Sequence, residues 1–191
     1  MRVIAGEYKG RRLAAPTWAG LRPTSDRLKE SVFAILAPSL EGARVLDGFA
    51  GTGALGIEAL SRGAASVVFV EQDGRAAGLI ERNLAHCGIA GGYVMIRAEF
   101  TRALRQLAVD RRFDLALLDP PYDLADLASV VEAAAGRMAH GGVLVLEHAS
   151  RRQAPARPGG FAAVRQVKAG DSTVTFYREA PEQSPAAAED P

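Results

Sequence analysis

The stretch from Val45 to Gly56 constrains the fold of this chain more than any other part of the sequence. Apolar residues lead into an acid, Asp47, a loop of small residues follows, and residues from Ala54 to Leu60 resemble the start of a helix. A strand, a tight loop and a helix N-terminus in this order place a ligand at the carboxyl end of a parallel sheet. Because Gly51 and Gly53 have no Cβ, the backbone can turn sharply there and lie close to that ligand.

The same glycines also fit the G-x-G-x-x-G spacing of a dinucleotide site, with Glu71 placed 20 residues after Gly51. Asp47 argues against a nicotinamide cofactor, because its negative charge would face the pyrophosphate at the end of the first strand. An acid at this position suits a cationic or zwitterionic ligand. Together with the residues at 119–122 described below, it favours S-adenosylmethionine, a cationic sulfonium with an amino-acid tail. A nicotinamide dehydrogenase and a glycine-rich turn without a ligand remain the alternatives.

The composition narrows the class of protein. The chain has 191 residues, of which 48% are hydrophobic, so it can form one domain with a sizeable core. Its only cysteine, Cys87, cannot form an internal disulfide, which indicates a reducing cytoplasm. The sequence has neither the apolar region of a signal peptide nor an apolar run long enough to cross a membrane. Since its three histidines are scattered, we expect no metal site, and we expect a monomer.

The net charge of +1 hides an uneven distribution. Residues 1–30 hold seven Lys and Arg residues against three acids, whereas residues 179–191 hold four acids and no base. A basic N-terminal segment predicts contacts with nucleic-acid phosphates, for which the candidates are Arg11, Arg12, Arg22 and Arg27. The acids Asp123 and Asp126 close to Tyr122 leave us expecting few bases around that residue. The alternatives are a solvated face, or a pairing of Arg22 or Arg27 with Asp26, Glu30 or a core acid.

The apolar patterns predict an α/β fold. Residues 2–14 suggest a hairpin, and a helix capped by Thr24 or Ser25 should run to about Leu36. Strands are then expected at 44–47, 66–71, 92–97, 113–118 and 142–147, with helices at 54–62, 74–86, 100–109 and 125–138. Two final strands, 162–168 and 173–178, should form an antiparallel hairpin. We therefore predict a Rossmann-like, doubly wound, mostly parallel seven-stranded sheet.

We divide the chain into three parts. Residues 1–40 form a basic extension made of a hairpin and a helix, residues 41–179 form the catalytic domain, and residues 180–191 form a disordered acidic tail. A parallel sheet that ends in an antiparallel hairpin is, by analogy, the usual sheet of class I S-adenosylmethionine-dependent methyltransferases.

The predicted cofactor site has two halves. Asp47, Ala50, Gly51 and Gly53 form the first, around the first strand and its loop. Glu71 ends the neighbouring strand, where a carboxylate can accept hydrogen bonds from both ribose hydroxyls. Glu99 and Phe100 follow the third strand, where an acid could meet the adenine amino group and an aromatic ring could cover the adenine face.

The predicted catalytic residues are Asp119, Pro120 and Tyr122, in the motif Asp119-Pro120-Pro121-Tyr122 at the end of the fourth strand. Tandem prolines fix φ and remove two donors, so they hold the Asp119 carboxylate and the Pro120 carbonyl as a rigid pair of acceptors. Two acceptors that grip the hydrogens of an exocyclic amine favour a pyramidal nitrogen with an available lone pair. Tyr122 can stack on the flipped base. The alternative is a rigid turn with a packed tyrosine.

With these residues in place, the chain resembles the RsmD family of small-subunit ribosomal RNA guanine-N2 methyltransferases. The resemblance rests on residues 2–6, 10–13, 21–30, 46–56, 58–64, 71 and 119–122, and Arg22-Pro23-Thr24-Ser25-Asp26-Arg27 narrows it most. It departs from the family at Gly48, where relatives often have a larger residue, and in the acidic tail.

The resemblance implies methyl transfer from S-adenosylmethionine to N2 of one guanine in small-subunit ribosomal RNA, within an assembled or assembling subunit. Two other functions remain open. DNA adenine-N6 methyltransferases share the Asp-Pro-Pro-Tyr motif, although the chain has no long insertion after residue 122 for a target-recognition region. A non-catalytic RNA-binding assembly factor could also keep this fold.

Overall fold

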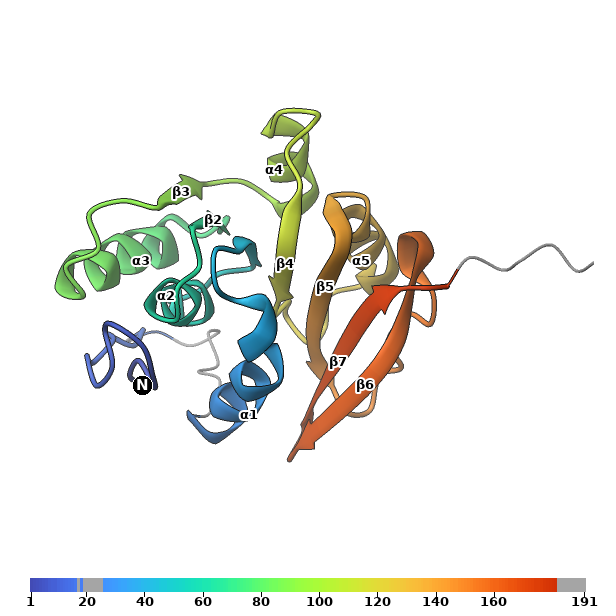
Figure 1. Ribbon diagram of the computed structural model, residues 1–191, viewed down its shortest axis with the longest axis horizontal. Helices are drawn as coiled ribbons and strands as arrows, with labels where there is room; N and C mark the ends of the chain where they lie inside the picture. Colours follow the sequence, from blue (N-terminus) through green and yellow to red (C-terminus); the bar gives the residue numbers. More distant parts are fainter. Residues whose placement is uncertain (17, 19–25, 182–191) are drawn as a thin grey trace, which may run out of the picture.

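The structure is a computed structural model that describes residues 1–16, 18 and 26–181. Within these residues, seven strands form one sheet in the order β3-β2-β1-β4-β5-β7-β6 (Figure 1). The parallel strands are β1 (Arg44–Gly48), β2 (Ser66–Val70), β3 (Tyr93–Ile96), β4 (Phe113–Leu118) and β5 (Met138–Ala149). The antiparallel edge is made by β6 (Phe161–Ala169) and β7 (Ser172–Glu179). The predicted doubly wound, mostly parallel sheet is therefore confirmed.

Helices cover both faces of this sheet (Figure 1). The helices α1 (Asp26–Leu36), α2 (Ala54–Ser61) and α3 (Gly74–His86) pack on one face, and α4 (Phe100–Gln106) and α5 (Leu127–Ala135) pack on the other. Two short 3₁₀ turns follow α1 and precede β6, at Ala37–Ser39 and Pro158–Gly160. Successive strand residues alternate between the two cores, which explains why the parallel strands are continuous apolar runs.

Two helices and one strand differ from the predicted bounds by three residues or more at one end. Because Leu107 is extended, α4 ends at Gln106, three residues early, and α5 begins after Asp126, whose carboxylate accepts the Ser129 N–H at 3.0 Å. The strand β5 begins four residues earlier than predicted and continues to Ala149. His148 thus lies inside the strand, buried, with Nε2 2.9 Å from Thr175 Oγ1.

The N-terminal segment is less regular than the predicted hairpin. It has an isolated antiparallel bridge between Arg2 and Arg12, beside a hydrogen bond from Val3 N–H to the Arg11 carbonyl at 3.0 Å. Val3 and Leu13 are buried in the core formed by α1, α2 and α3, so the segment contributes to the same core as the sheet. Thr24 and Ser25, the predicted helix caps, lie outside the described residues.

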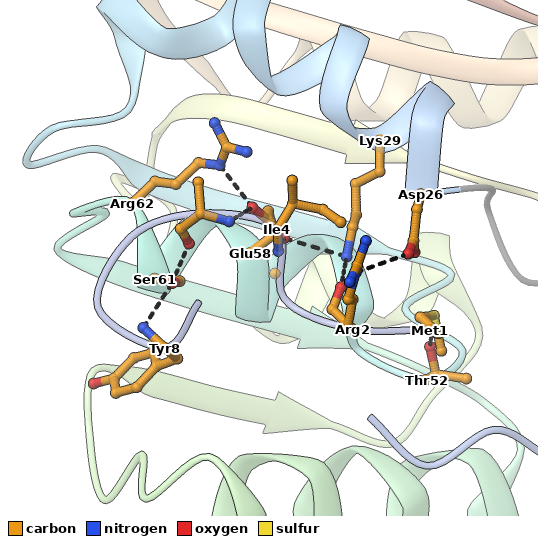
Figure 2. Close-up of polar contacts among 12 residues, drawn as sticks. Met1, Arg2, Ile4, Tyr8, Asp26, Lys29, Thr52, Glu58, Ser61 and Arg62 are labelled. Carbon is orange, nitrogen blue, oxygen red and sulfur yellow. Dashed lines mark hydrogen bonds and ion pairs between the residues drawn. The ribbon is translucent and has the colours of Figure 1, made fainter. Parts of the chain in front are cut away.

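A buried acid on α2, Glu58, binds the N-terminal segment and α1 through hydrogen bonds and ion pairs (Figure 2). Glu58 accepts the N–H groups of Ile4 at 2.8 Å and Ala5 at 3.0 Å. It also pairs with Lys29 Nζ at 3.2 Å and Arg62 Nε at 2.7 Å. Lys29 donates in turn to the Arg2 carbonyl at 2.6 Å, and the side chains of Lys29 and Glu58 are 1% and 0% exposed. We call this group the Glu58 cluster; it joins the N-terminal segment, α1 and α2.

Within the described residues, no helix combines the length and the apolar character that a membrane span needs.

Candidate active site

A cavity of about 740 Å³ opens at the carboxyl ends of β1, β2, β4 and β5. The predicted residues that line it are Asp47, Ala50, Gly51, Glu71, Phe100, Asp119, Pro120 and Tyr122. Two other predicted cofactor residues, Gly53 and Glu99, are not among its lining residues. The topology therefore gathers most of the candidate cofactor residues and all three candidate catalytic residues around one space.

The loop after β1 takes its shape from unusual backbone angles. Phe49, Gly51 and Gly53 have φ values of 63°, 56° and 75°, in the left-handed region that disfavours residues with a Cβ. Gly53 also precedes α2, where an added Cβ would lie 2.9 Å from the side chain of Ile80. Gly53 thus lets the loop pack against Ile80 and does not line the cavity, whereas Ala50 and Gly51 line it.

Asp47 holds the start of α2 against β1. Its carboxylate, 1% exposed, accepts the Gly56 N–H at 2.8 Å. Burial raises the pKa of Asp47 to about 8, the hydrogen bond from Gly56 opposes that rise, and the charge of Glu71 adds to it. Because the folded pKa exceeds the ordinary value of 3.8, the folded protein keeps this proton where the unfolded chain releases it. Asp47 therefore lowers the free energy of unfolding progressively as the pH rises from about 3.8 to about 8.

Glu71 directly follows β2 and stabilises the same loop. One carboxylate oxygen accepts the Gly51 N–H at 2.8 Å, and the other accepts the Asp73 N–H at 2.8 Å. Each carboxylate oxygen can accept more than one hydrogen bond, so both can still accept hydroxyl groups of a ligand. Glu71 can thus shape the glycine loop and hold a ribose at the same time.

Phe100 and Glu99 have different positions although they are neighbours. The buried Phe100 ring lines the cavity and stacks on Phe49, with ring centroids 5.0 Å apart and an interplanar angle of 21°. A Cβ on Gly48 would lie 2.5 Å from this ring, which accounts for glycine at that position. The Glu99 carboxylate instead accepts the N–H groups of Thr101 and Arg102, each at 2.9 Å, and caps α4.

The Asp119–Tyr122 segment follows β4 directly. The Asp119 N–H donates to the Gly48 carbonyl at 3.4 Å, which places the motif beside the end of β1. The Tyr122 hydroxyl contacts Glu147 Oε1 at 3.4 Å and the Ser172 hydroxyl. Sequence reasoning missed Glu147 and Ser172, because they lie in β5 and at the start of β7, far from the motif in the sequence. Glu147 follows an apolar strand run, as Asp119 does, and that pattern could have revealed it.

The surroundings of Tyr122 also hold a base that we did not expect. Arg152 donates to the carbonyls of Tyr122 at 3.1 Å and Leu124 at 2.6 Å. The expectation of an acidic surrounding was based on neighbours in the sequence, whereas Arg152 is brought there by the chain that follows β5.

The basic N-terminal residues lie in several environments. Arg11, Arg12 and Arg27 are exposed, and Arg11 donates to the His86 carbonyl at 3.1 Å. Arg22 lies outside the described residues. The acid Asp26 pairs with Arg2 at 3.3 Å.

The N-terminal segment also forms part of the cavity wall, through Met1, Trp18 and Leu28. Met1 Sδ is 3.7 Å from Thr52 Oγ1, beside the glycine loop (Figure 2). Within the part of the chain that the structure describes, no group of His, Cys, Asp and Glu residues could hold a metal ion.

Comparison with known proteins finds a matching family, relatives in sequence and a similar solved structure. The family described as Conserved hypothetical protein 95 matches residues 1–178. Ribosomal RNA small subunit methyltransferase D of Escherichia coli K12 is 33% identical over 189 residues, covering 97% of this chain and 94% of its own. The enzyme of the same name from Haemophilus influenzae is 41% identical over 124 residues, 64% of each chain. A solved Escherichia coli structure, provisionally described as the methyltransferase yhhF, has a TM-score of 0.81 and 33% identity, covering 95% of this chain and 99% of its own.

Proposed function

We propose, because the chain belongs to the RsmD family of small-subunit ribosomal RNA methyltransferases, that it methylates the exocyclic N2 amine of a guanine in that RNA. It has the class I methyltransferase fold. The observation that carries the proposal is the shared cavity, which Asp47 and Glu71 line together with Asp119, Pro120 and Tyr122.

The residues present fit S-adenosylmethionine. The cavity has a volume typical of small-molecule sites. The Glu71 carboxylate can accept the ribose hydroxyls, Phe100 offers a buried ring for the adenine, and Asp47 can face the cationic amino-acid end. Glu99 remains a candidate for the adenine amino group. When bound, the cofactor supplies an activated methyl group on a sulfonium.

The Asp-Pro-Pro-Tyr segment acts on the base. The Asp119 carboxylate and the Pro120 carbonyl accept the two N2 hydrogens, which holds the amine pyramidal and makes its lone pair available. The Tyr122 ring gives the flipped base a face to stack on, which is worth about 1–3 kcal/mol. The contact of its hydroxyl with Ser172 and Glu147 fixes the orientation of that ring.

The RNA-binding part of the proposal concerns the N-terminal segment. Arg11, Arg12 and Arg27 are exposed, so they can reach phosphates, and Arg22, outside the described residues, stays a candidate for the same role. We propose that the substrate is the assembled or assembling small ribosomal subunit and that the enzyme acts as a monomer in the cytoplasm. Arg152 is a further base beside Tyr122 that can support the backbone of the target nucleotide.

The test is to incubate the protein with isotopically labelled S-adenosylmethionine and small ribosomal subunits that lack the modification, and then to analyse the nucleosides. Labelled N2-methylguanosine in the RNA is the expected product. Labelled N6-methyladenine from added DNA would instead establish the DNA enzyme, and no transfer to either substrate would favour the non-catalytic assembly factor. In the same assay Asp119→Ala should lower the methylation rate steeply and leave the affinity for S-adenosylhomocysteine almost unchanged. Near-normal turnover by that variant would remove Asp119 from the mechanism.

A further inference from the structure

Glu147 lines the cavity, and the only role given to it above is the contact that orients the Tyr122 ring. We infer that its carboxylate accepts the N1–H of the target base and so selects guanine over adenine. The inference rests on the proposed function, because it concerns recognition of the base whose N2 amine is methylated.

The sheet places Glu147 beside Asp119. β4 and β5 are parallel, with Leu118 opposite Leu146, so the next residues along the two strands are Asp119 and Glu147. Neighbouring strands are about 4.8 Å apart, which brings the two carboxyl groups onto adjacent positions of one sheet edge. Leu118 and Leu146 both pack in the core beneath α4 and α5, so the residues that follow them project away from that core. Both acids line the cavity.

This pair of acceptors matches guanine. On its Watson–Crick edge, guanine presents the N2 amine next to N1–H, which is a row of donors. Adenine also has an exocyclic amine next to N1, but its N1 is an acceptor. With the amine held by Asp119, a carboxylate at the neighbouring position gains a hydrogen bond from guanine and repels the lone pair of adenine. The second acid therefore supplies both the attraction and the repulsion that discrimination needs.

Contacts of Glu147 support this placement. Tyr122, the residue proposed to stack on the base, has its hydroxyl 3.4 Å from Glu147 Oε1. The same hydroxyl contacts Ser172, the first residue of β7, so this strand helps to hold the Tyr122 ring. The stacking ring and the acid are thus fixed relative to one another, as recognition of the face and the edge of one base requires.

The experiment compares two bases at the target position. Small subunits are reconstituted with guanine there, or with 2-aminopurine, which keeps the amine at C2 but has an acceptor at N1. The wild-type protein should favour guanine by about 5- to 150-fold in kcat/KM, the range expected of one discriminating contact. Glu147→Gln should reduce this preference by about fivefold or more, because the amide can donate to an acceptor at N1. This change should raise the rate on 2-aminopurine as well as lowering the rate on guanine.

Two further variants test whether the change in base preference comes from the hydrogen-bonding group at position 147. Glu147→Ala should lower the rate on guanine and raise the rate on 2-aminopurine less than Glu147→Gln does, because alanine removes the repulsion but offers no donor to N1. Asp171→Asn neutralises another acid of the cavity wall and should leave the preference between the bases unchanged. Equal losses on both bases for Glu147→Gln, or an unchanged preference, would overturn the inference. Failure of the wild-type protein to methylate guanine would instead refute the proposed function, so the two failures are distinguishable.

Discussion

Replacing Glu58 with alanine should destabilise the protein more than any substitution of an exposed charge. The Glu58 carboxylate is completely buried and receives N–H groups from Ile4, Ala5, Lys29 and Arg62. Its removal leaves the Lys29 ammonium buried without its anion, at a cost of about 3–5 kcal/mol for a broken buried pair. Each backbone N–H left without an acceptor costs about 1–3 kcal/mol if it stays buried, although such losses do not add fully. We therefore expect the free energy of unfolding to fall by at least about 3 kcal/mol.

The assay is equilibrium unfolding in urea at neutral pH, with Asp114→Ala as the matched control. Asp114 also pairs with an arginine, Arg44, at 2.9 Å, but those side chains are 38% and 44% exposed. An exposed pair contributes about 0–1 kcal/mol, so the control should unfold close to the wild-type midpoint. Both substitutions remove a carboxylate that binds a cation and a backbone N–H. The difference between their costs in unfolding free energy therefore measures the effect of burial.

A second comparison separates charge from the loss of packing. Lys29→Met should cost less than Glu58→Ala, because Glu58 would keep Arg62 and two backbone donors. Combining Lys29→Met with Glu58→Gln should cost less than the sum of the two single changes, by about 0.5–3 kcal/mol of coupling. A cost for Glu58→Ala as small as that of Asp114→Ala would refute the reasoning. If the costs of Lys29→Met and Glu58→Gln simply add in the double variant, the Lys29–Glu58 pair is not the source of the stability.

Three further predictions concern binding. By calorimetry, the affinity for S-adenosylhomocysteine should rise by up to about tenfold per pH unit to about pH 8 and then level off, because the ammonium group of the ligand favours ionised Asp47. Asp47→Asn should abolish this pH dependence. Glu71→Ala should weaken that affinity about tenfold or more, since hydrogen bonds to charged groups contribute about 1.5–3 kcal/mol each, and unchanged affinity would exclude a ribose contact. Replacing Arg11 and Arg12 together with alanine should weaken binding to the ribosomal substrate and reduce the log–log salt slope by about 0.7–0.9 per lost contact, with unchanged cofactor affinity. An unchanged salt slope would leave the segment with a structural role.

Much of the fold could be predicted because its signals are local. The apolar runs of β2 and β4 and the glycines after β1 depend on neighbours in the sequence, and they predicted the strands and the loop within one or two residues. The start of β5 was missed because Gly141 and Gly142 look like a turn. In the structure they lie inside the strand, at the point where its register with β4 shifts between Phe113 and Leu115.

The contacts that depend on topology were missed. Lys29 and Glu58 are separated by 29 residues, and each looks like an ordinary helical surface charge. Only the packing of α1 and the N-terminal segment against α2 buries them together. Glu147 was missed for the same reason, since its position beside Asp119 follows from the order of the strands rather than from a motif.

The helix α2 connects the two halves of the proposed activity. At its start, Gly56 donates to Asp47 and so fixes the loop that faces the cofactor. Two residues later, Glu58 holds the segment that carries the proposed RNA-binding arginines. Because Met1 of that segment also lines the cavity, a displacement of the segment changes the wall of the cofactor site. The buried charge pair is therefore placed where it holds the segment with the proposed RNA-binding arginines in a fixed relation to the loop after β1, a role that can offset its cost of desolvation.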